Sequence, residues 1–262
     1  QKSLKRQSGL PAKVSVVGNM PTISPSVVLT EHPQPPKWVV ERFIPQDTVI
    51  VLAGLEGTGK SVFSYATALA VATGQPILGL PTTQLRVLYF DSENSRPDFG
   101  GYLRQLWLGM GAPNPKHIDE FLRIEHFSLT IDWQHRFASI CAEWKPGLII
   151  VDTANSCFSI VDENSNAEAA KIVSLVNQAR PAESSVILMK HEREKKEGRD
   201  RSVRGAKYWL GAVDQVVYFS KAGGNPLPPY NLWRTKLTPA KKREYGLEHE
   251  VKITPNLEMG PL

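Results

Sequence analysis

Residues 54–61 read Gly-Leu-Glu-Gly-Thr-Gly-Lys-Ser, and they lie between an apolar run at residues 48–54 and a helical pattern over residues 60–73. Glycines allow backbone N–H groups to turn inward around phosphate oxygens. A helix that begins at the lysine adds the positive end of its dipole. The Gly-x4-Gly-Lys-Ser spacing, placed between a strand and a helix, therefore predicts a phosphate-binding loop.

The loop predicts a nucleotide site that uses Mg²⁺. Lys60 is expected to reach the β- and γ-phosphates, and the Ser61 hydroxyl is expected to ligate the metal ion. A later apolar run, residues 148–152, ends in a carboxylate, so Asp152 is expected to hold Mg²⁺ and its waters opposite Ser61. The predicted nucleotide-binding residues are Gly54, Glu56, Gly57, Thr58, Gly59, Lys60, Ser61, Val62 and Asp152.

Hydrolysis of a nucleotide also needs a group that orients the attacking water. Residues 86–91 form an apolar run that ends in Asp91 and is followed by Glu93. We take Glu93 as the candidate general base and Asp91 as its alternative, because both carboxylates follow a buried strand. A third interpretation is that both acids lie in a solvent-exposed loop and have no catalytic role.

Short apolar runs alternate with helical patterns after residue 36. This alternation predicts an α/β fold, a mainly parallel twisted sheet with helices on both faces. The last two runs have no helix between them, which predicts a C-terminal antiparallel β extension. The predicted strands are residues 48–54, 86–91, 122–127, 148–152, 185–190, 214–219, 230–236 and 247–253. The predicted helices are residues 60–73, 96–110, 133–144, 165–180 and 204–211.

Composition sets the broad limits. A chain of 262 residues with 41% hydrophobic content supports one large domain, which we place at residues 36–262. Residues 1–35 are rich in Pro, Ser and basic residues and are expected to be an N-terminal extension or linker. The net charge of +5 permits a polyanionic partner. Two cysteines without metal-ligand spacing, and no apolar run near the roughly 20 residues that cross a bilayer, favour a cytoplasmic protein away from membranes.

The order of these motifs resembles that of the RecA-like P-loop ATPases, and within them the RepA-type hexameric replicative helicases of plasmids. The resemblance spans about residues 36–236. Besides the loop, it rests on PKWVVERFIP (36–45), YFDSEN (89–94), LIIVDT (148–153), ILMKH (187–191) and SVRGA (202–206). It implies that ATP and Mg²⁺ bind between the subunits of a homo-oligomeric, hexameric ring. Because the sequence lacks an initiator Met, we expect it to be part of a longer protein.

The resemblance also assigns roles to single residues. Glu93 matches the catalytic glutamate, and His191 lies where the family has a polar residue that senses the γ-phosphate. Arg204 matches an arginine finger that reaches the nucleotide of the neighbouring subunit. Lys236 is a second candidate for contact across that interface. The chain departs from the family pattern at Lys190, Ala206 and Lys207.

Two loops match those that face the central channel in RecA-like motors, at residues 153–166 and 192–203. The second loop carries five basic and four acidic residues, so its charge alone favours phosphate binding only weakly. The alternative is a solvated loop without a ligand. The nucleic-acid candidates are Lys195, Lys196, Arg199 and Arg201.

These expectations converge on an ATPase that couples hydrolysis to translocation on, or unwinding of, single-stranded DNA in replication. A primase or another replication protein is the expected partner besides further copies of the chain. Two alternatives belong to other classes. One is a non-motor ATP-binding switch in recombination or regulation, which would hydrolyse ATP slowly. The other is a small-molecule kinase, whose turnover would not depend on protein concentration.

Overall fold

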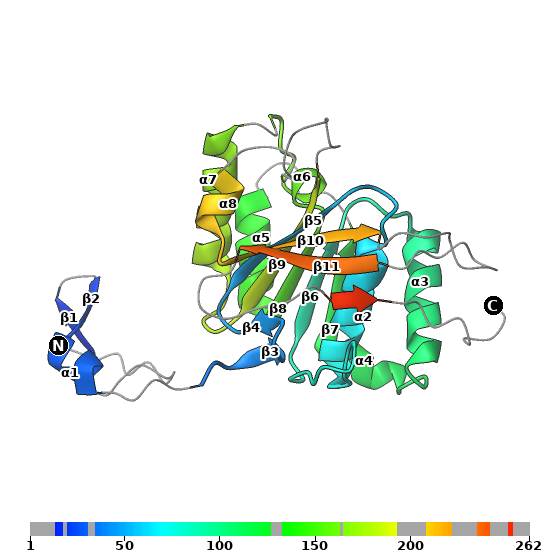
Figure 1. Ribbon diagram of the computed structural model, residues 1–262, viewed down its shortest axis with the longest axis horizontal. Helices are drawn as coiled ribbons and strands as arrows, with labels where there is room; N and C mark the ends of the chain where they lie inside the picture. Colours follow the sequence, from blue (N-terminus) through cyan, green and yellow to red (C-terminus); the bar gives the residue numbers. More distant parts are fainter. Residues whose placement is uncertain are drawn as a thin grey trace. The chain divides into compact units, whose positions relative to one another are not determined.

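The computed structural model divides into two compact units, residues 1–36 and residues 37–262 (Figure 1). The residues that the structure describes are 14–17, 20–30, 35–126, 133–162, 165–192, 208–221, 235–241 and 251–253. None of the helices in these ranges combines the length and the apolar character needed to span a bilayer.

The first unit contains a small hairpin and one helix. β1 (Val14–Val17) pairs antiparallel with β2 (Met20–Ile23), and α1 (Pro25–Thr30) follows. From the sequence, only an extension or linker is expected here. The signal that this expectation did not use is the dipeptide Gly-Asn between two short apolar runs, which is typical of hairpin sequences.

Eight strands of the second unit form one sheet in the order β12-β11-β10-β5-β9-β8-β6-β7. Neighbours from β10 to β7 are parallel, whereas β11 and β12 extend the β10 edge antiparallel. The predicted fold class, with its C-terminal antiparallel extension, is therefore confirmed. The strands are β5 (Val49–Gly54), β6 (Val87–Asp91), β7 (Leu122–His126), β8 (Leu148–Asp152), β9 (Ser185–His191), β10 (Gln215–Lys221), β11 (Thr235–Lys241) and β12 (Val251–Ile253). A separate antiparallel pair joins β3 (Trp38–Val40) and β4 (Ile44–Pro45).

β11 continues past the residue at which the sequence analysis ended its strand. The prediction stopped at residue 236, but the strand runs to Lys241 and includes Pro239. Proline cannot donate to a strand ladder and therefore favours an edge. β12 pairs only with residues 235–237, so Pro239 lies where β11 has β10 as its described neighbour. Among the described residues, the proline therefore interrupts no pairing with β12.

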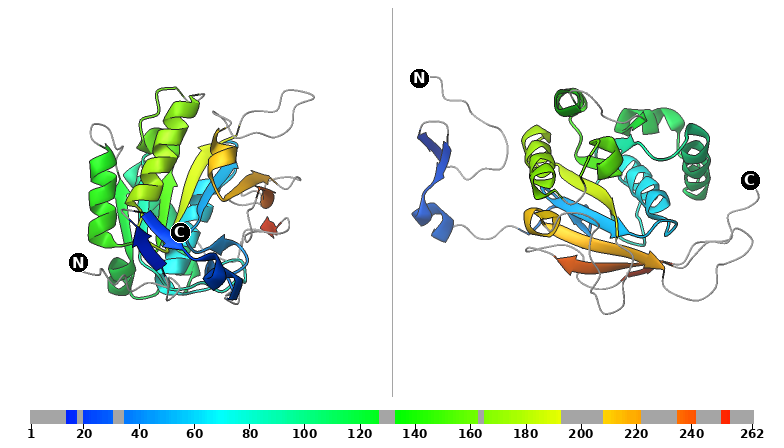
Figure 2. Two further views of the ribbon diagram at one scale, coloured as in Figure 1. Left: turned by 90° about the vertical axis from the view of Figure 1, so that its left-hand side faces the viewer. Right: turned by 90° about the horizontal axis from the view of Figure 1, so that it is seen from above.

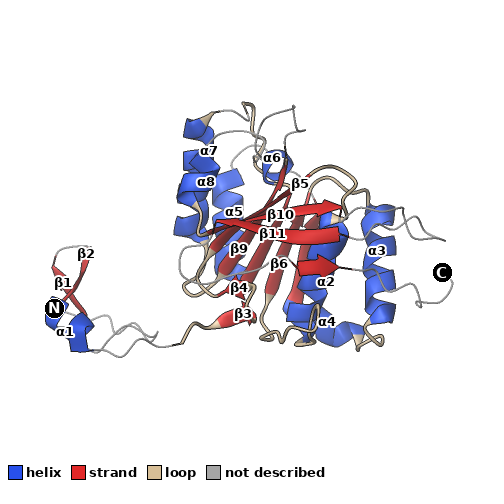
Figure 3. Ribbon diagram, viewed as in Figure 1, coloured by secondary structure: helices blue, strands red, loops and turns tan. Residues whose placement is uncertain are grey.

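Helices cover both faces of the sheet (Figures 2 and 3). One face packs against α2 (Lys60–Thr73), α3 (Arg96–Gly109) and α4 (Pro115–Phe121). The other face packs against α5 (Trp133–Trp144), α6 (Ala154–Cys157), α7 (Asn166–Ala179) and α8 (Tyr208–Ala212). The sequence pattern predicts neither α4 nor α6, because both helices are too short to show a helical period of apolar residues.

Side-chain alternation along the strands divides the core into two layers. In β6, Val87 and Tyr89 belong to the layer of α2, whereas Leu88 and Phe90 belong to the layer of α5 and α7. Successive side chains of a strand point to opposite faces, so a residue's parity decides which helical layer it meets. The same rule places the polar residues that end β6, β8 and β9.

Candidate active site

The loop between β5 and α2 has a backbone that requires glycine. Gly57 and Gly59 have φ angles of +65° and +89°, a region that side-chain-bearing residues rarely adopt. A Cβ atom on Gly54 would lie 2.3 Å from the backbone oxygen of Phe219, because β10 runs directly beside β5. The Thr58 hydroxyl closes the turn by donating to the Leu55 oxygen at 2.7 Å. The loop shape is thus set by residues that the motif specifies.

α2 begins from this loop without a side-chain cap. At the starts of α3 and α7, the hydroxyls of Ser95 and Ser165 accept hydrogen bonds from N–H groups of the first turn. The corresponding residue of α2 is Gly59, which has no side chain to do this. No capping side chain therefore competes with a phosphate for the positive end of α2, which is the geometry that a phosphate loop requires.

Lys60 is the first residue of α2, and its side chain folds back over the loop. Nζ donates to the carbonyl oxygens of Gly54 and Leu55 at 3.0 and 2.8 Å, and only 6% of the residue is exposed. Burial lowers the pKa of this ammonium group, while Asp152 and Glu93 act in the opposite direction. A nucleotide phosphate would give the amine a fully charged partner instead of carbonyl dipoles.

Three polar residues end neighbouring strands on the face that α2 covers. Asp91 ends β6, Asp152 ends β8 and His191 ends β9. Asp91 lies beside Asp152 in the register of β6 and β8, and His191 lies beside Gly54 in the register of β5 and β9. All three share the parity of the core residues that face α2. Sheet register and parity therefore bring the separately predicted acids to the phosphate loop.

Asp152 has the contacts expected of a metal ligand. Tyr89 donates to its Oδ2 at 2.9 Å, and the carboxylate also accepts a hydrogen bond from Ser61. Its Oδ1 is buried and has no hydrogen-bond partner among the described residues. Burial raises the pKa of this carboxyl to about 6, although the hydrogen bonds from Ser61 and Tyr89 oppose the shift. A buried carboxylate oxygen without a donor, close to a serine hydroxyl, fits Mg²⁺.

The protein would contribute few of the ligands to that ion. Ser61 and Asp152 would hold it, and phosphate oxygens and waters would complete its shell, as is usual for Mg²⁺ at nucleotides. In the part of the chain that the structure describes, no three His, Cys, Asp or Glu side chains gather into a metal cluster. When bound, Mg²⁺ would neutralise charge on the phosphates.

Glu93 lies two residues beyond β6, and one oxygen of its carboxylate is fixed. Oε1 accepts hydrogen bonds from Thr153 at 2.6 Å and Ser156 at 3.2 Å, and lies 3.4 Å from Nε2 of His191. Every hydrogen bond that the described residues make to this carboxylate goes to Oε1, so Oε2 can accept one from water. The His191 hydrogen bond lowers the pKa of Glu93 to about 2; Thr153 and Ser156 add to the effect and burial opposes it. A carboxylate that stays ionised suits the orientation of water more than the removal of its proton.

Asp91, the alternative to Glu93, is completely buried, and both of its carboxylate oxygens accept hydrogen bonds. Its Oδ1 accepts the N–H groups of Glu93 and Asn94 at 3.2 and 3.1 Å, and Tyr65 donates to its Oδ2. These bonds hold the turn that carries Glu93 and engage both oxygens of Asp91. The burial of Asp91 also excludes the interpretation that both acids are solvent-exposed. The geometry therefore favours Glu93 as the residue that orients water.

Lys190, one of the departures from the family pattern, faces away from the phosphate loop. Its neighbour His191 points to the α2 layer, so parity directs Lys190 to the opposite layer. There its ammonium donates to Oδ1 of Asn155 on α6 and lies 4.6 Å from the ring centroid of Trp209 on α8. The departure from the family pattern at Lys190 therefore does not alter the side of the sheet that faces the phosphate loop.

Several predicted residues lie outside the residues that the structure describes. These are Arg204 with the departures Ala206 and Lys207, and the nucleic-acid candidates Lys195, Lys196, Arg199 and Arg201. Lys236 lies on β11, but its side chain is not among those described. The roles assigned to these residues stay predictions.

Four residues that the sequence analysis did not select complete the site. They are Thr153 and Ser156, which donate to Glu93, and Tyr65 and Tyr89, which donate to the acids that end β6 and β8. Thr153 could have been found, because it directly follows the predicted metal ligand. The tyrosines could not, because an aromatic residue inside an apolar run is usually a core residue.

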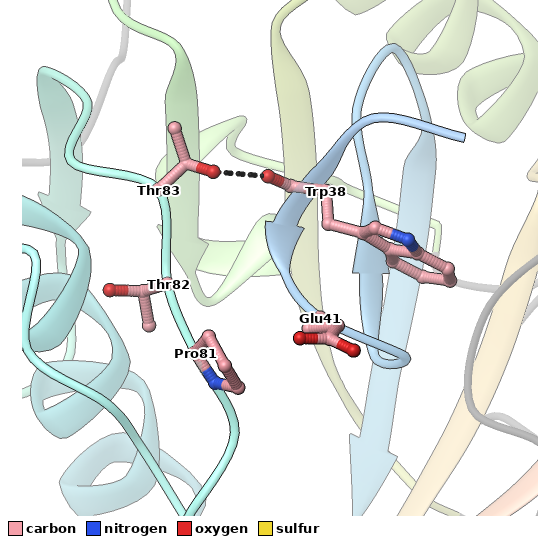
Figure 4. Close-up of a pocket in the computed structure, with 5 residues that line it drawn as sticks. All are labelled: Trp38, Glu41, Pro81, Thr82 and Thr83. Carbon is pink, nitrogen blue, oxygen red and sulfur yellow. Dashed lines mark hydrogen bonds between the residues drawn. The ribbon is translucent and has the colours of Figure 1, made fainter. Parts of the chain in front are cut away.

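A pocket lies near the amino-terminal ends of the strands, opposite the ends that carry the site (Figure 4). Its lining residues are Trp38, Glu41, Pro81, Thr82 and Thr83. The last three precede β6, whereas the site residues follow the strands, so the pocket is at the amino-terminal edge. Thr83 is tied to β3 through its hydroxyl, which donates to the Trp38 oxygen at 2.7 Å. The pocket therefore has no part in the site around Lys60.

Comparisons with known proteins agree with this architecture. A protein-family profile described as an AAA domain matches residues 22–197, which is more than half of the chain. The crystal structure of the RadB recombinase matches with a TM-score of 0.56 over 78% of this chain and 86% of that one, at 14% sequence identity. No match was found among curated protein sequences. At that identity the structural likeness shows the fold, and with the family match it shows that the chain belongs to the AAA-domain family and is a RecA-like P-loop ATPase.

Proposed function

We propose that this protein is a Mg²⁺-dependent ATPase that hydrolyses ATP between identical subunits of a ring and couples hydrolysis to movement along single-stranded DNA. A helicase role in replication is the specific form of this proposal. The observation that carries it is the carboxylate of Glu93, which Thr153, Ser156 and His191 hold beside the loop of Lys60. A site that only bound nucleotide would not need a carboxylate oriented in this way.

The chain's own residues divide the chemistry. Lys60 and the first turn of α2 would bind the phosphates, and Ser61 and Asp152 would hold Mg²⁺. Glu93 would orient the attacking water through Oε2 while its Oε1 stays fixed. His191 contacts Glu93 and ends the strand next to the phosphate loop, so a γ-phosphate could alter both residues together.

The inter-subunit and DNA parts of the proposal rest on sequence motifs. Arg204 would reach the nucleotide of a neighbouring copy, where a cation stabilises the charge that develops in the transition state. The basic residues of the loop at 192–203 would contact the backbone of single-stranded DNA. Arg204 and the loop at 192–203 both precede α8, which begins at Tyr208.

A recombination role is the second candidate, and the likeness to the RadB recombinase favours it. In this form the protein would bind ATP and assemble on DNA or on a partner, but would hydrolyse slowly and unwind nothing. The same nucleotide contacts serve both candidates. They differ in turnover, so kinetics separates them.

The decisive experiment measures ATPase rate against protein concentration, with and without single-stranded DNA, for wild type and Arg204→Ala. A rise with concentration, stimulation by DNA and a loss of about 10³-fold in Arg204→Ala are expected for hydrolysis between subunits. Arg104→Ala, at an exposed position of α3, is the matched control and should leave the rate unchanged. A DNA-stimulated strand-displacement activity would separate the helicase from the recombination form.

Two results would contradict the proposal. A rate per subunit that is constant with concentration, indifferent to DNA and retained in Arg204→Ala would exclude hydrolysis between subunits. Slow, DNA-dependent turnover without strand displacement would instead support the recombination switch.

A further inference from the structure

Two buried tyrosines stack between the helix of the phosphate loop and the central sheet. Tyr65 comes from α2 and Tyr89 from β6, with ring centroids 4.9 Å apart and planes inclined by 24°. Both residues are 0% exposed. A buried phenol needs a hydrogen-bond partner, so the two hydroxyls direct the pair toward polar groups.

Tyr89 contacts the predicted metal ligand. Its hydroxyl donates to Oδ2 of Asp152 at 2.9 Å and is also hydrogen-bonded to Ser64 Oγ at 2.6 Å. Ser64 lies one turn after Ser61 on α2, and its single hydroxyl hydrogen is donated to Tyr89, because the Tyr89 hydrogen is given to Asp152. The bonds from Ser64 to Tyr89 and from Tyr89 to Asp152 link this carboxylate to α2, and its Oδ1 has no partner among the described residues.

Tyr65 contacts the other carboxylate. Its hydroxyl donates to Oδ2 of Asp91, and the side-chain amide of Asn94 donates to the same hydroxyl at 3.1 Å. Oδ1 of Asp91 accepts the backbone N–H of Glu93 at 3.2 Å. Tyr65 therefore orients Asp91, and Asp91 fixes the backbone from which the Glu93 side chain extends.

We propose that the stacked pair separately positions the two carboxylates of the site: Tyr89 sets Asp152 for Mg²⁺, and Tyr65, through Asp91, sets Glu93 for the attacking water. Neither tyrosine touches substrate in this scheme, so both are positioning residues. The inference rests on the proposed ATPase function. It adds that Tyr65 of α2 and Tyr89 of β6, the latter hydrogen-bonded to Ser64 of α2, orient the residues that would hold the metal and the water.

The substitution of tyrosine by phenylalanine isolates the role of each hydroxyl, because it keeps the ring, its stacking and its volume. If the hydroxyls had a purely structural role, both variants would be less stable. Neither would then show a selective change in kcat or in the Mg²⁺ concentration for half-maximal rate. A positioning role predicts that each variant loses a different step. Groups that orient a metal ligand typically change metal affinity by about 10–100-fold when removed.

The test compares Tyr89→Phe, Tyr65→Phe and wild type. It measures kcat, the Mg²⁺ concentration for half-maximal rate, and the binding of a fluorescent ATP analogue with Mg²⁺ and with EDTA. Tyr89→Phe should raise the half-saturating Mg²⁺ concentration about 10-fold and weaken analogue binding only when Mg²⁺ is present. Tyr65→Phe should lower kcat about 10-fold and leave the Mg²⁺ dependence and the analogue binding unchanged.

Tyr102→Phe, at an exposed position of α3, is the matched control and should behave as wild type. If a variant at the stacked pair unfolds, Ser64→Ala and Asn94→Ala each remove one hydrogen bond from the same two hydroxyls and should show the same split at smaller size. The inference would be overturned if both variants lost kcat and Mg²⁺ affinity equally, or if the two effects did not separate between Tyr89→Phe and Tyr65→Phe. Hydrolysis of ATP by the wild type would still support the proposed function in that case. A wild type that binds the analogue but does not hydrolyse ATP would overturn the proposed function and the role of Tyr65, and the Mg²⁺-dependent binding of Tyr89→Phe would still decide the role of Tyr89.

Discussion

Burial makes Lys60 costly to the folded protein unless it binds an anion. Desolvation lowers the pKa of its ammonium group, and its hydrogen bonds go to the carbonyl oxygens of Gly54 and Leu55. Removing such a cation relieves the cost of burial but also removes a charged contact to phosphate. We expect Lys60→Ala to weaken nucleotide binding about 100-fold and to keep or raise the melting temperature without nucleotide.

Titration with a fluorescent ATP analogue and thermal unfolding check this pair of effects. Lys116→Ala removes an exposed lysine from α4 and serves as the control. Unchanged analogue affinity in Lys60→Ala would place the nucleotide elsewhere.

Glu93 allows a separation of binding from hydrolysis. Its Oε1 is fixed by three donors, so Glu93→Gln keeps the shape of the side chain but weakens the interaction with water. We expect hydrolysis to fall about 100-fold and analogue binding to stay within the wild-type range. Single-turnover kinetics with pre-bound ATP measures the chemical step directly. A variant that hydrolyses at the wild-type rate would remove Glu93 from the mechanism.

The low pKa of Glu93 also predicts a pH dependence of stability. The folded state lowers this pKa from 4.5 to about 2, so the ionised carboxylate stabilises the fold above pH 4.5. That contribution is lost as the pH falls from 4.5 through 2, because the unfolded chain takes up the proton first. In denaturant unfolding measured between pH 6 and pH 2, Glu93→Gln should therefore lose less stability on acidification than wild type. Parallel curves for the two proteins would mean that the hydrogen bonds to Glu93 do not form in solution.

At the scale of elements, the close approach of β5 and β10 constrains the start of the phosphate loop. A Cβ atom at Gly54 would lie 2.3 Å from the backbone oxygen of Phe219, and a backbone atom cannot move away as a side-chain end can. We expect Gly54→Ala to lower the free energy of unfolding by about 3 kcal/mol, the upper end for overpacking. Denaturant unfolding of the purified variant measures this.

Gly101→Ala is the matched substitution in a place without that constraint. Gly101 lies inside α3, and a Cβ there would meet no atom within 4 Å. Alanine is favoured over glycine in a helix interior, so this variant should gain about 0.5–1 kcal/mol. If both variants changed stability in the same direction, the contact between β5 and β10 would not be the cause of the effect at Gly54.

For the whole molecule, the two compact units make a prediction about truncation. Residues 37–262 contain the sheet, both helical layers and the site, so a chain that starts at residue 37 should fold and bind nucleotide. With Mg²⁺ and nucleotide at about 100 times the dissociation constant, its stability should rise by about 2.7 kcal/mol. That gain corresponds to a rise of roughly 5–10 °C in melting temperature for a domain of this size. The family match begins at residue 22, so failure of the truncated chain to bind would assign residues 22–36 to the functional core.

Local patterns in the sequence determined the fold class and predict the principal site residues. Alternating apolar runs and helical patterns predict the parallel sheet, because strand and helix periods are properties of short segments. The glycine-lysine loop and the acids that follow buried strands predict Lys60, Ser61 and Asp152 in the same way. The strand that runs beyond its predicted end is β11, where Pro239 interrupts the local pattern and pairing with β10 carries the strand to Lys241.

Only the tertiary structure decided which contacts the predicted acids make. The register of β6 against β8 and the parity of each strand bury Asp91 under Tyr65 and leave Glu93 to be held by Thr153 and Ser156. Strand parity likewise places Tyr89 on the face of the sheet that α2 covers and Lys190 on the opposite face. These relations join segments far apart in the chain, and no spacing within one segment encodes them. Residue types and local periods fix what each segment is, whereas packing between segments fixes which side chains meet.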